Sequence, residues 1–137
     1  MAMMNSFIHI KNAQVRNASN DGMELLGHFL LGKVGVDAHF FIMFFEDAEN
    51  GAIASGAYFL EKLDDMVYLE HLESSKLMPF ETTRRNFIDI LKRWQSACKS
   101  PTSSACNAQG SDLIIIRSLN GRDFSFDTQL PDDVMLV

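Results

Sequence analysis

Apolar residues at helical spacing predict two helices in this sequence. The clearer helix follows a capping threonine, Thr82 or Thr83, and basic residues in its later turns suit the helix dipole. A shorter helix is predicted over about residues 22–31, where Asp21 and Glu24 have the spacing of a reciprocal cap. The apolar stripe of the clearer helix consists of Phe87, Ile90, Leu91, Trp94, Ala97 and Cys98.

The segment 34–45 fits either a helix or a strand. Its four phenylalanines, at positions 40, 41, 44 and 45, have the spacing of a buried helical face, but phenylalanine is also a strong strand former. Three acidic residues follow, and negative charge at a helix C-terminus opposes the helix dipole. This misfit favours a strand slightly, or marks an acidic surface kept for a partner. The three acids are Glu46, Asp47 and Glu49.

Alternating apolar and polar residues predict the strands. Turn residues divide them, and Asn120-Gly121 is the strongest short hairpin signal in the chain. We expect an opening strand over residues 7–15, a turn over 17–21, a hairpin of 57–62 and 66–71 around Asp64-Asp65, an edge strand at 76–80, and a second hairpin over 113–126.

The order of these elements predicts an α+β fold. The elements are, in chain order, a strand, one or two short helices, a hairpin, a long helix and a second hairpin. They bury their apolar faces when helices pack mainly on one face of an antiparallel sheet. At 137 residues, and without a repeat or a linker, the chain is expected to form one domain over residues 1–137.

The charge balance favours a protein partner over nucleic acid. The formal net charge is −6, and lysines and arginines are scattered except for a cluster on the long helix. Nucleic-acid binders concentrate such residues, whereas an acidic protein attracts a basic partner, so no direct nucleic-acid binding is expected. The apolar runs are too short to span a membrane, and no signal peptide is visible, so we expect a cytoplasmic protein and no membrane contact.

Catalytic and cofactor motifs are not found, so neither enzymatic activity nor a cofactor is expected. The glycines have no phosphate-loop spacing, and the four histidines lie far apart in the sequence, which gives no metal motif. Cys98 and Cys106 are expected to be free thiols. The enzymatic alternative is a site assembled in space from Cys98 or Cys106 with His71.

The region from Glu24 to Gln95 resembles small immunity proteins encoded beside bacterial polymorphic toxins, including those of contact-dependent growth inhibition systems. The resemblance rests on residues 24–31 (ELLGHFLL), the phenylalanine-rich segment after Asp37, the hairpin of residues 58–72 and the pattern Thr83-x-x-x-Phe87-x-x-x-Leu91-x-x-Trp94. It implies a cytoplasmic protein that binds and neutralises a cognate toxin domain, often a nuclease, by covering its active or substrate-binding site. The oligomeric state is left open.

The residues that we expect to bind the partner are chosen from their chemistry. Acidic side chains suit a basic toxin surface, and a tyrosine with an exposed face can anchor an interface. A secretion chaperone or adaptor would share these features and is the alternative binding function. The predicted partner-binding residues are Glu46, Asp47, Glu49, Tyr58, Glu61, Asp64, Asp65, Tyr68, Glu70 and Glu73.

Overall fold

The structure, a computed structural model, describes residues 6–11, 14–19, 21–34, 38–47, 49–74, 76–99, 113–118 and 123–127. These residues form eight strands, three α-helices and one π-helical turn, labelled η1. In chain order they are β1 (Ser6–Lys11), β2 (Gln14–Ala18), α1 (Met23–Phe29), η1 (Leu30–Val34), α2 (His39–Glu46), β3 (Gly51–Ser55), β4 (Tyr58–Leu63), β5 (Met66–His71), β6 (Phe80–Thr83), α3 (Arg84–Lys99), β7 (Leu113–Ser118) and β8 (Ser125–Asp127).

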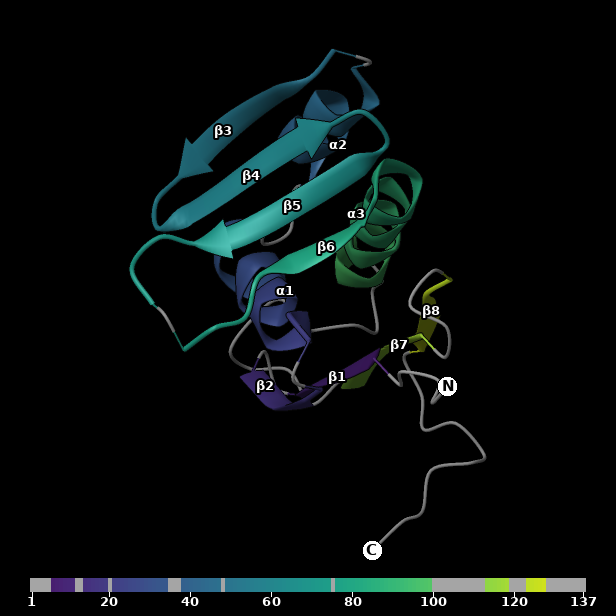
Figure 1. The fold of residues 1–137 in the computed structure, drawn as a ribbon. Helices are drawn as coiled ribbons and strands as arrows, with labels where there is room; N and C mark the ends of the chain where they lie inside the picture. Colours follow the sequence, from purple (N-terminus) through teal and green to yellow (C-terminus); the bar gives the residue numbers. More distant parts are fainter. Residues whose placement is uncertain are drawn as a thin grey trace, which may run out of the picture.

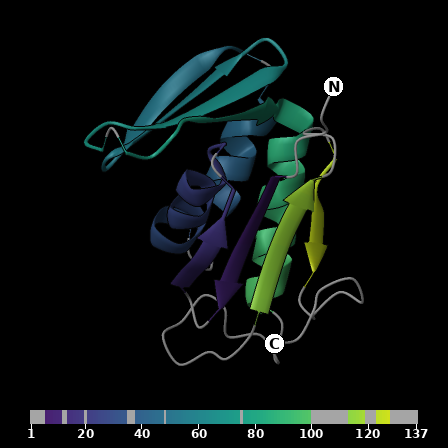
Figure 2. The same ribbon diagram turned by 60° about the horizontal axis from the view of Figure 1, so that its bottom comes forward.

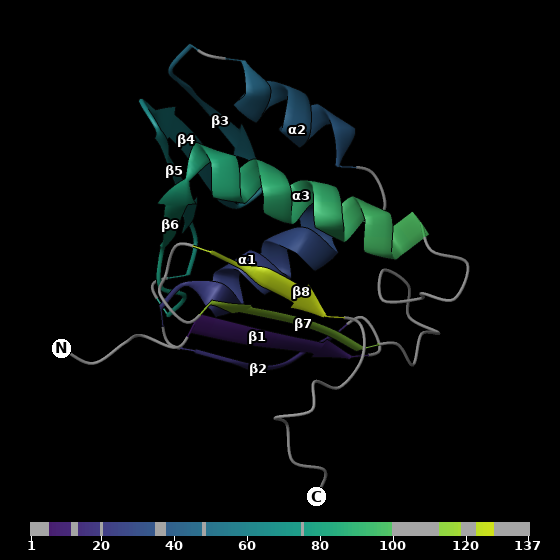
Figure 3. The same ribbon diagram turned by 90° about the vertical axis from the view of Figure 1, so that its right-hand side faces the viewer.

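The strands form two four-stranded antiparallel sheets (Figure 1). Sheet A has the order β2-β1-β7-β8, and sheet B has the order β3-β4-β5-β6. Figure 2 looks onto sheet A with the helices behind it, and Figure 3 shows sheet B standing across one end of the helices. The helices therefore lie on one face of each sheet. The predicted α+β class is confirmed, but the strands are divided between two sheets where the sequence suggested one.

One hydrophobic core joins both sheets to the helices. Sheet A contributes isoleucines of β1 and β7, sheet B contributes leucines of β4 and β5, and Trp94 of α3 is fully buried in the same core, as predicted. The prediction that Thr82 or Thr83 caps α3 is also confirmed, because the amide of Asn86 donates a hydrogen bond of 3.1 Å to the Thr83 hydroxyl.

Helix α1 begins differently from the prediction. Its N-cap is Gly22, whose φ of 94° lies in the left-handed region, and no side chain caps the helix. Asp21 instead accepts hydrogen bonds from the hydroxyls of Ser6 and Ser19, which ties the helix start to sheet A. The predicted reciprocal cap of Asp21 and Glu24 is therefore wrong.

Segment 39–46 is the helix α2, so the preference for a strand was wrong. Its buried face consists of Phe41, Ile42 and Phe45, whereas Phe40 is 62% exposed and lies outside the stripe. The acidic C-terminus is stabilised from other elements. Lys62, only 2% exposed, donates through Nζ to the backbone carbonyls of Phe44 and, at 2.9 Å, of Asp47. Cations at a helix C-terminus satisfy its free carbonyls and its dipole, and this offsets the acidic residues.

The strands differ from the prediction at three places. The opening segment forms two strands, β1 and β2, with a register shift between His9 and Ile10, and residues 17 and 18 belong to β2 and not to a turn. Strand β3 was not predicted, and the edge strand β6 lies at residues 80–83 and not at 76–80. The hairpin of β4 and β5 around Asp64-Asp65 and the pairing of β7 with β8 are confirmed. Asn120 and Gly121, predicted to turn the latter, lie outside the described residues.

Candidate protein-binding surface

Sheet B has one face toward the helices and one face without any helix on it (Figure 1). Leu60 and Lys62 of β4 and Val67 and Leu69 of β5 are buried on the inner face. Strand residues alternate between faces, so their sequence neighbours point outward. Together with the pairing register, this defines the outer face of sheet B as Ala52, Ala54, Phe59, Glu61, Leu63, Met66, Tyr68, Glu70, Glu81 and Thr83.

Aromatic and acidic side chains alternate across this outer face. Tyr68 of β5 is paired with Glu61 of β4 on one side and with Glu81 of β6 on the other. In the next row Phe59 of β4 faces Glu70 of β5. Directly opposed side chains on neighbouring strands lie about 4.5–5.5 Å apart at Cβ, so each ring is bordered by a carboxylate. The ten residues include three glutamates and neither lysine nor arginine.

A second acidic group borders one end of sheet B. We call Asp47, Glu49, Asp64 and Asp65 the acidic rim; all four are exposed. Arg84 holds its parts together, since its guanidinium donates to the carbonyls of Asp47 at 2.9 Å and Asp64 at 2.6 Å. The backbone amide of Arg84 donates to the carbonyl of Asp65 at 2.6 Å. Arg84 thus binds backbone oxygens of the rim and not its carboxylates, which stay exposed; that of Asp47 also accepts the amide of Glu49 at 3.2 Å.

The predicted partner-binding residues are thus partly brought together. Glu61, Tyr68 and Glu70 share the outer face of sheet B, and the acidic rim adjoins it through the turn between β4 and β5. Glu46 is separate, because it forms an ion pair of 3.2 Å with Lys92 on the side of α2 and α3. Glu73 follows β5 at the other end of the sheet.

Tyr58 lies on the inner face of sheet B, and its side chain is half-buried. Its ring contacts Phe29 and His71 at centroid distances of 5.5 and 5.2 Å, and burial raises the pKa of its phenol. Of the two predicted tyrosines, Tyr68 therefore lies on the free face, and Tyr58 borders the core.

Two aromatic or acidic residues of this surface were missed from the sequence. Glu81 and Phe59 both point outward beside predicted residues, Tyr68 and Glu70. The alternation within residues 58–63 would have placed Phe59 together with Glu61, but Glu81 could be placed only after β6 had been assigned correctly.

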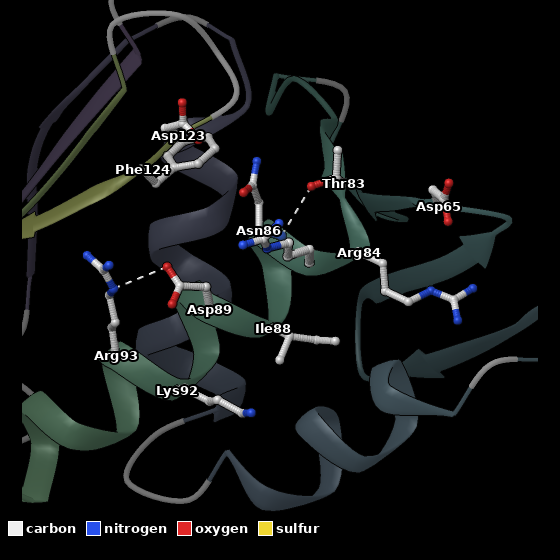
Figure 4. A pocket seen from close by; sticks show the side chains of 11 residues that line it. Asp65, Thr83, Arg84, Asn86, Ile88, Asp89, Lys92, Arg93, Asp123 and Phe124 are labelled. Carbon is white, nitrogen blue, oxygen red and sulfur yellow. Dashed lines mark hydrogen bonds and ion pairs between the residues drawn. The ribbon is translucent and has the colours of Figure 1, made fainter.

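A cleft of about 1070 Å³ runs along the first half of α3 (Figure 4). Its lining contains all four cations of the basic cluster noted in the sequence, Arg84, Arg85, Lys92 and Arg93, and three of them are already engaged. Arg93 pairs with Asp89 at 3.1 Å, Lys92 pairs with Glu46 at 3.2 Å, and Arg84 binds backbone carbonyls. Because the carboxylates of Asp65 and Asp123 also line the cleft, it presents little uncompensated positive charge to an anion.

A smaller groove of about 680 Å³ lies where sheet B meets α1 and β2, and its lining includes Tyr58, His28 and His71. The Nδ1 atom of His71 accepts hydrogen bonds from the amides of Glu73 and Ser74, at 3.2 and 2.9 Å, so the imidazole is held in position by backbone. Cys106 and the side chain of Cys98, which the enzymatic alternative requires, lie outside the described residues.

The described residues offer no grouping for a metal ion and no single helix for a membrane span. These residues contain no group of three histidine, cysteine, aspartate or glutamate side chains placed to hold a metal ion. Within them no single helix has the length and hydropathy to cross a membrane. One pair of segments has the length and composition for a span, but it is bent by 117°; the pair is Met23–Val34 with His39–Glu46.

Comparison with known proteins adds no relative. No protein-family model, no curated protein sequence and no solved structure matches this chain.

Proposed function

We propose that this chain is an immunity-type protein that binds a basic toxin domain, of the nuclease class, and neutralises it in the cytoplasm by covering its active or substrate-binding site. The observation that supports this proposal is the outer face of sheet B, where Tyr68 and Phe59 lie between glutamates and no cation is present. A nucleic-acid-cleaving domain needs a basic cleft for its substrate. An acidic face with aromatic anchors is complementary to such a cleft.

Charge and aromatic burial would contribute differently to this association. The net charge of −6 and the acidic rim accelerate the encounter with a basic partner, an effect that salt weakens. Tyr68 and Phe59 contribute to the lifetime of the complex once water is excluded around them. Charge therefore governs the association rate, and aromatic burial governs the dissociation rate.

The direct test is capture of the partner from the cells that make this protein. A tagged chain is used for affinity purification in moderate salt, and bound proteins are identified by mass spectrometry. We expect one dominant partner with a basic toxin-like domain, whose purified activity stops when an equimolar amount of this chain is added. Several unrelated secreted partners would instead indicate a chaperone or adaptor, and a partner whose activity is unchanged in the complex would contradict neutralisation.

A further inference from the structure

The free edge of sheet B at β3 differs from the other sheet edges in the described part of the chain. Natural proteins protect exposed edges with charges, prolines, bulges or very short strands, because an open edge can pair with another strand. Strand β2 has a register shift against β1 and carries Arg16. Strand β8 has three residues, and β6 follows Pro79 and carries Glu81.

Strand β3 carries none of these features. Its sequence is Gly-Ala-Ile-Ala-Ser, without charge or proline, and its register with β4 is continuous over all five residues. Figure 1 shows β3 at the margin of sheet B with no further strand beside it. Among the described edges, β3 is therefore the one open to strand pairing.

The hairpin geometry identifies the backbone groups that are free at this edge. The turn of Gly56 and Ala57 joins β3 to β4, and Ser55 and Tyr58 are its closing pair. A two-residue hairpin closes on a hydrogen-bonded pair, and bonded and non-bonded pairs alternate along antiparallel strands. Ser55, Ile53 and Gly51 therefore bond to β4. Ala52 and Ala54 direct their amides and carbonyls away from the sheet.

We propose that the partner adds a fifth strand to sheet B at β3, and that this strand carries long cationic side chains on the outer face. The inference rests on the proposed function and specifies how the partner binds. Ala52 and Ala54 lie on the outer face, next to Glu61 and Phe59 respectively. A fifth strand would lie about 10 Å from β4, two strand spacings away. The small alanines leave the path open for a lysine or arginine to reach the Glu61 carboxylate and the Phe59 ring.

The size of the outer face also favours an additional contact at its edge. Four strands about 4.8 Å apart, with about five residues each, cover roughly 300–400 Å². A stable interface buries roughly 800 Å² on each partner. Strand addition extends the contact and provides main-chain hydrogen bonds, while pockets for alternate side chains give specificity.

The test uses the full-length protein with a synthetic peptide as a probe. The probe is a nine-residue peptide that alternates lysine with valine and threonine, and the matched control has glutamate in place of lysine. Amide shifts and hydrogen exchange are followed by NMR. With the lysine peptide, exchange at Ala52 and Ala54 should slow by about 10-fold, whereas Ile53, already bonded to β4, should change little. The glutamate peptide should have no such effect.

Two variants examine the edge itself. Ala52→Pro removes one outward amide and spares the bonds from β3 to β4, and Ala54→Lys places a protecting charge on the edge. Each should abolish the slowing at the remaining edge position while the thermal unfolding midpoint stays near that of the parent protein. Retained protection in folded Ala54→Lys would overturn the proposal.

The remaining outcomes separate this inference from the proposed function. Shifts on the outer face without slower exchange at Ala52 and Ala54 would overturn strand addition but leave an acidic binding face in place. Equal protection by both peptides would overturn the cationic requirement. Protection that appears without peptide and rises with protein concentration would identify a second copy of this chain as the occupant, which also overturns the proposal.

Discussion

The two sheets share one architecture but differ on their outer faces. Each has four antiparallel strands with helices on one side. The outer face of sheet A carries Lys11 and Arg117, and Ile115 on that face is only 1% exposed. The outer face of sheet B has glutamates beside Phe59 and Tyr68 and no cation. The outer face of sheet A is therefore packed at Ile115, whereas the outer face of sheet B leaves Glu70 and Glu81 exposed for binding.

The largest expected effect tests whether the two outer faces differ in their contribution to stability. Ile115→Ala in sheet A should lower the free energy of unfolding by about 2–4 kcal/mol, because it leaves a cavity in a packed environment. The matched change is Leu63→Ala on sheet B, where the isomeric side chain is 46% exposed and the cost should stay below about 1 kcal/mol. Urea denaturation measures both. Equal costs would remove the distinction between the faces.

The inner face of sheet B provides a second comparison, because it holds a buried cation. Lys62→Met should cost about 1–3 kcal/mol, since the carbonyls of Phe44 and Asp47 lose their donor. The control is Lys92→Met, which removes an exposed ion pair with Glu46 and should cost less than about 0.5 kcal/mol. Before any denaturant is added, the helical circular dichroism should fall only in the Lys62 variant, because the end of α2 loses its donor. Urea denaturation measures both costs. A stable Lys62→Met protein would show that the C-terminus of α2 does not depend on this lysine.

The smallest expected effect concerns His9, on the outer face of sheet A. Burial, and secondarily the nearby Arg117, lower the pKa of His9. The unfolded chain then binds the proton more readily, so this contribution to stability is present above pH of about 6.5 and is lost as the pH falls through the lowered folded-state pKa. His9→Asn should flatten that part of the stability profile. Unfolding midpoints at several pH values measure it, and an unchanged slope would contradict the assignment.

Local patterns were sufficient to predict the elements whose stability is local. The stripe of α3, its Thr83 cap and the hairpin around Asp64-Asp65 each depend on residues near one another in sequence. Helix α2 could not be predicted in this way, because Lys62 and Arg84 that satisfy its C-terminus come from later in the chain. Strand β3 has weak strand formers and depends on pairing with β4.

The candidate surface was predictable to a similar extent. Chemistry alone selected Glu61, Tyr68 and Glu70, which share one face because they alternate on paired strands. It could not separate Glu46, whose partner Lys92 lies on another helix. The position of a charged residue in the sequence does not show whether the fold pairs it with an opposite charge. A charged surface is therefore only partly predictable from sequence.

The most direct test of the binding face is the association rate of the captured partner as a function of salt. Glu61→Lys with Glu81→Lys reverses two charges on the outer face of sheet B. Glu24→Lys with Glu46→Lys makes the same change in net charge elsewhere, at exposed carboxylates of α1 and α2. We predict that the first pair slows association by about 10-fold or more and weakens its salt dependence, and that the second pair has a much smaller effect. Equal effects of the two pairs, or none from either, would contradict binding through this face.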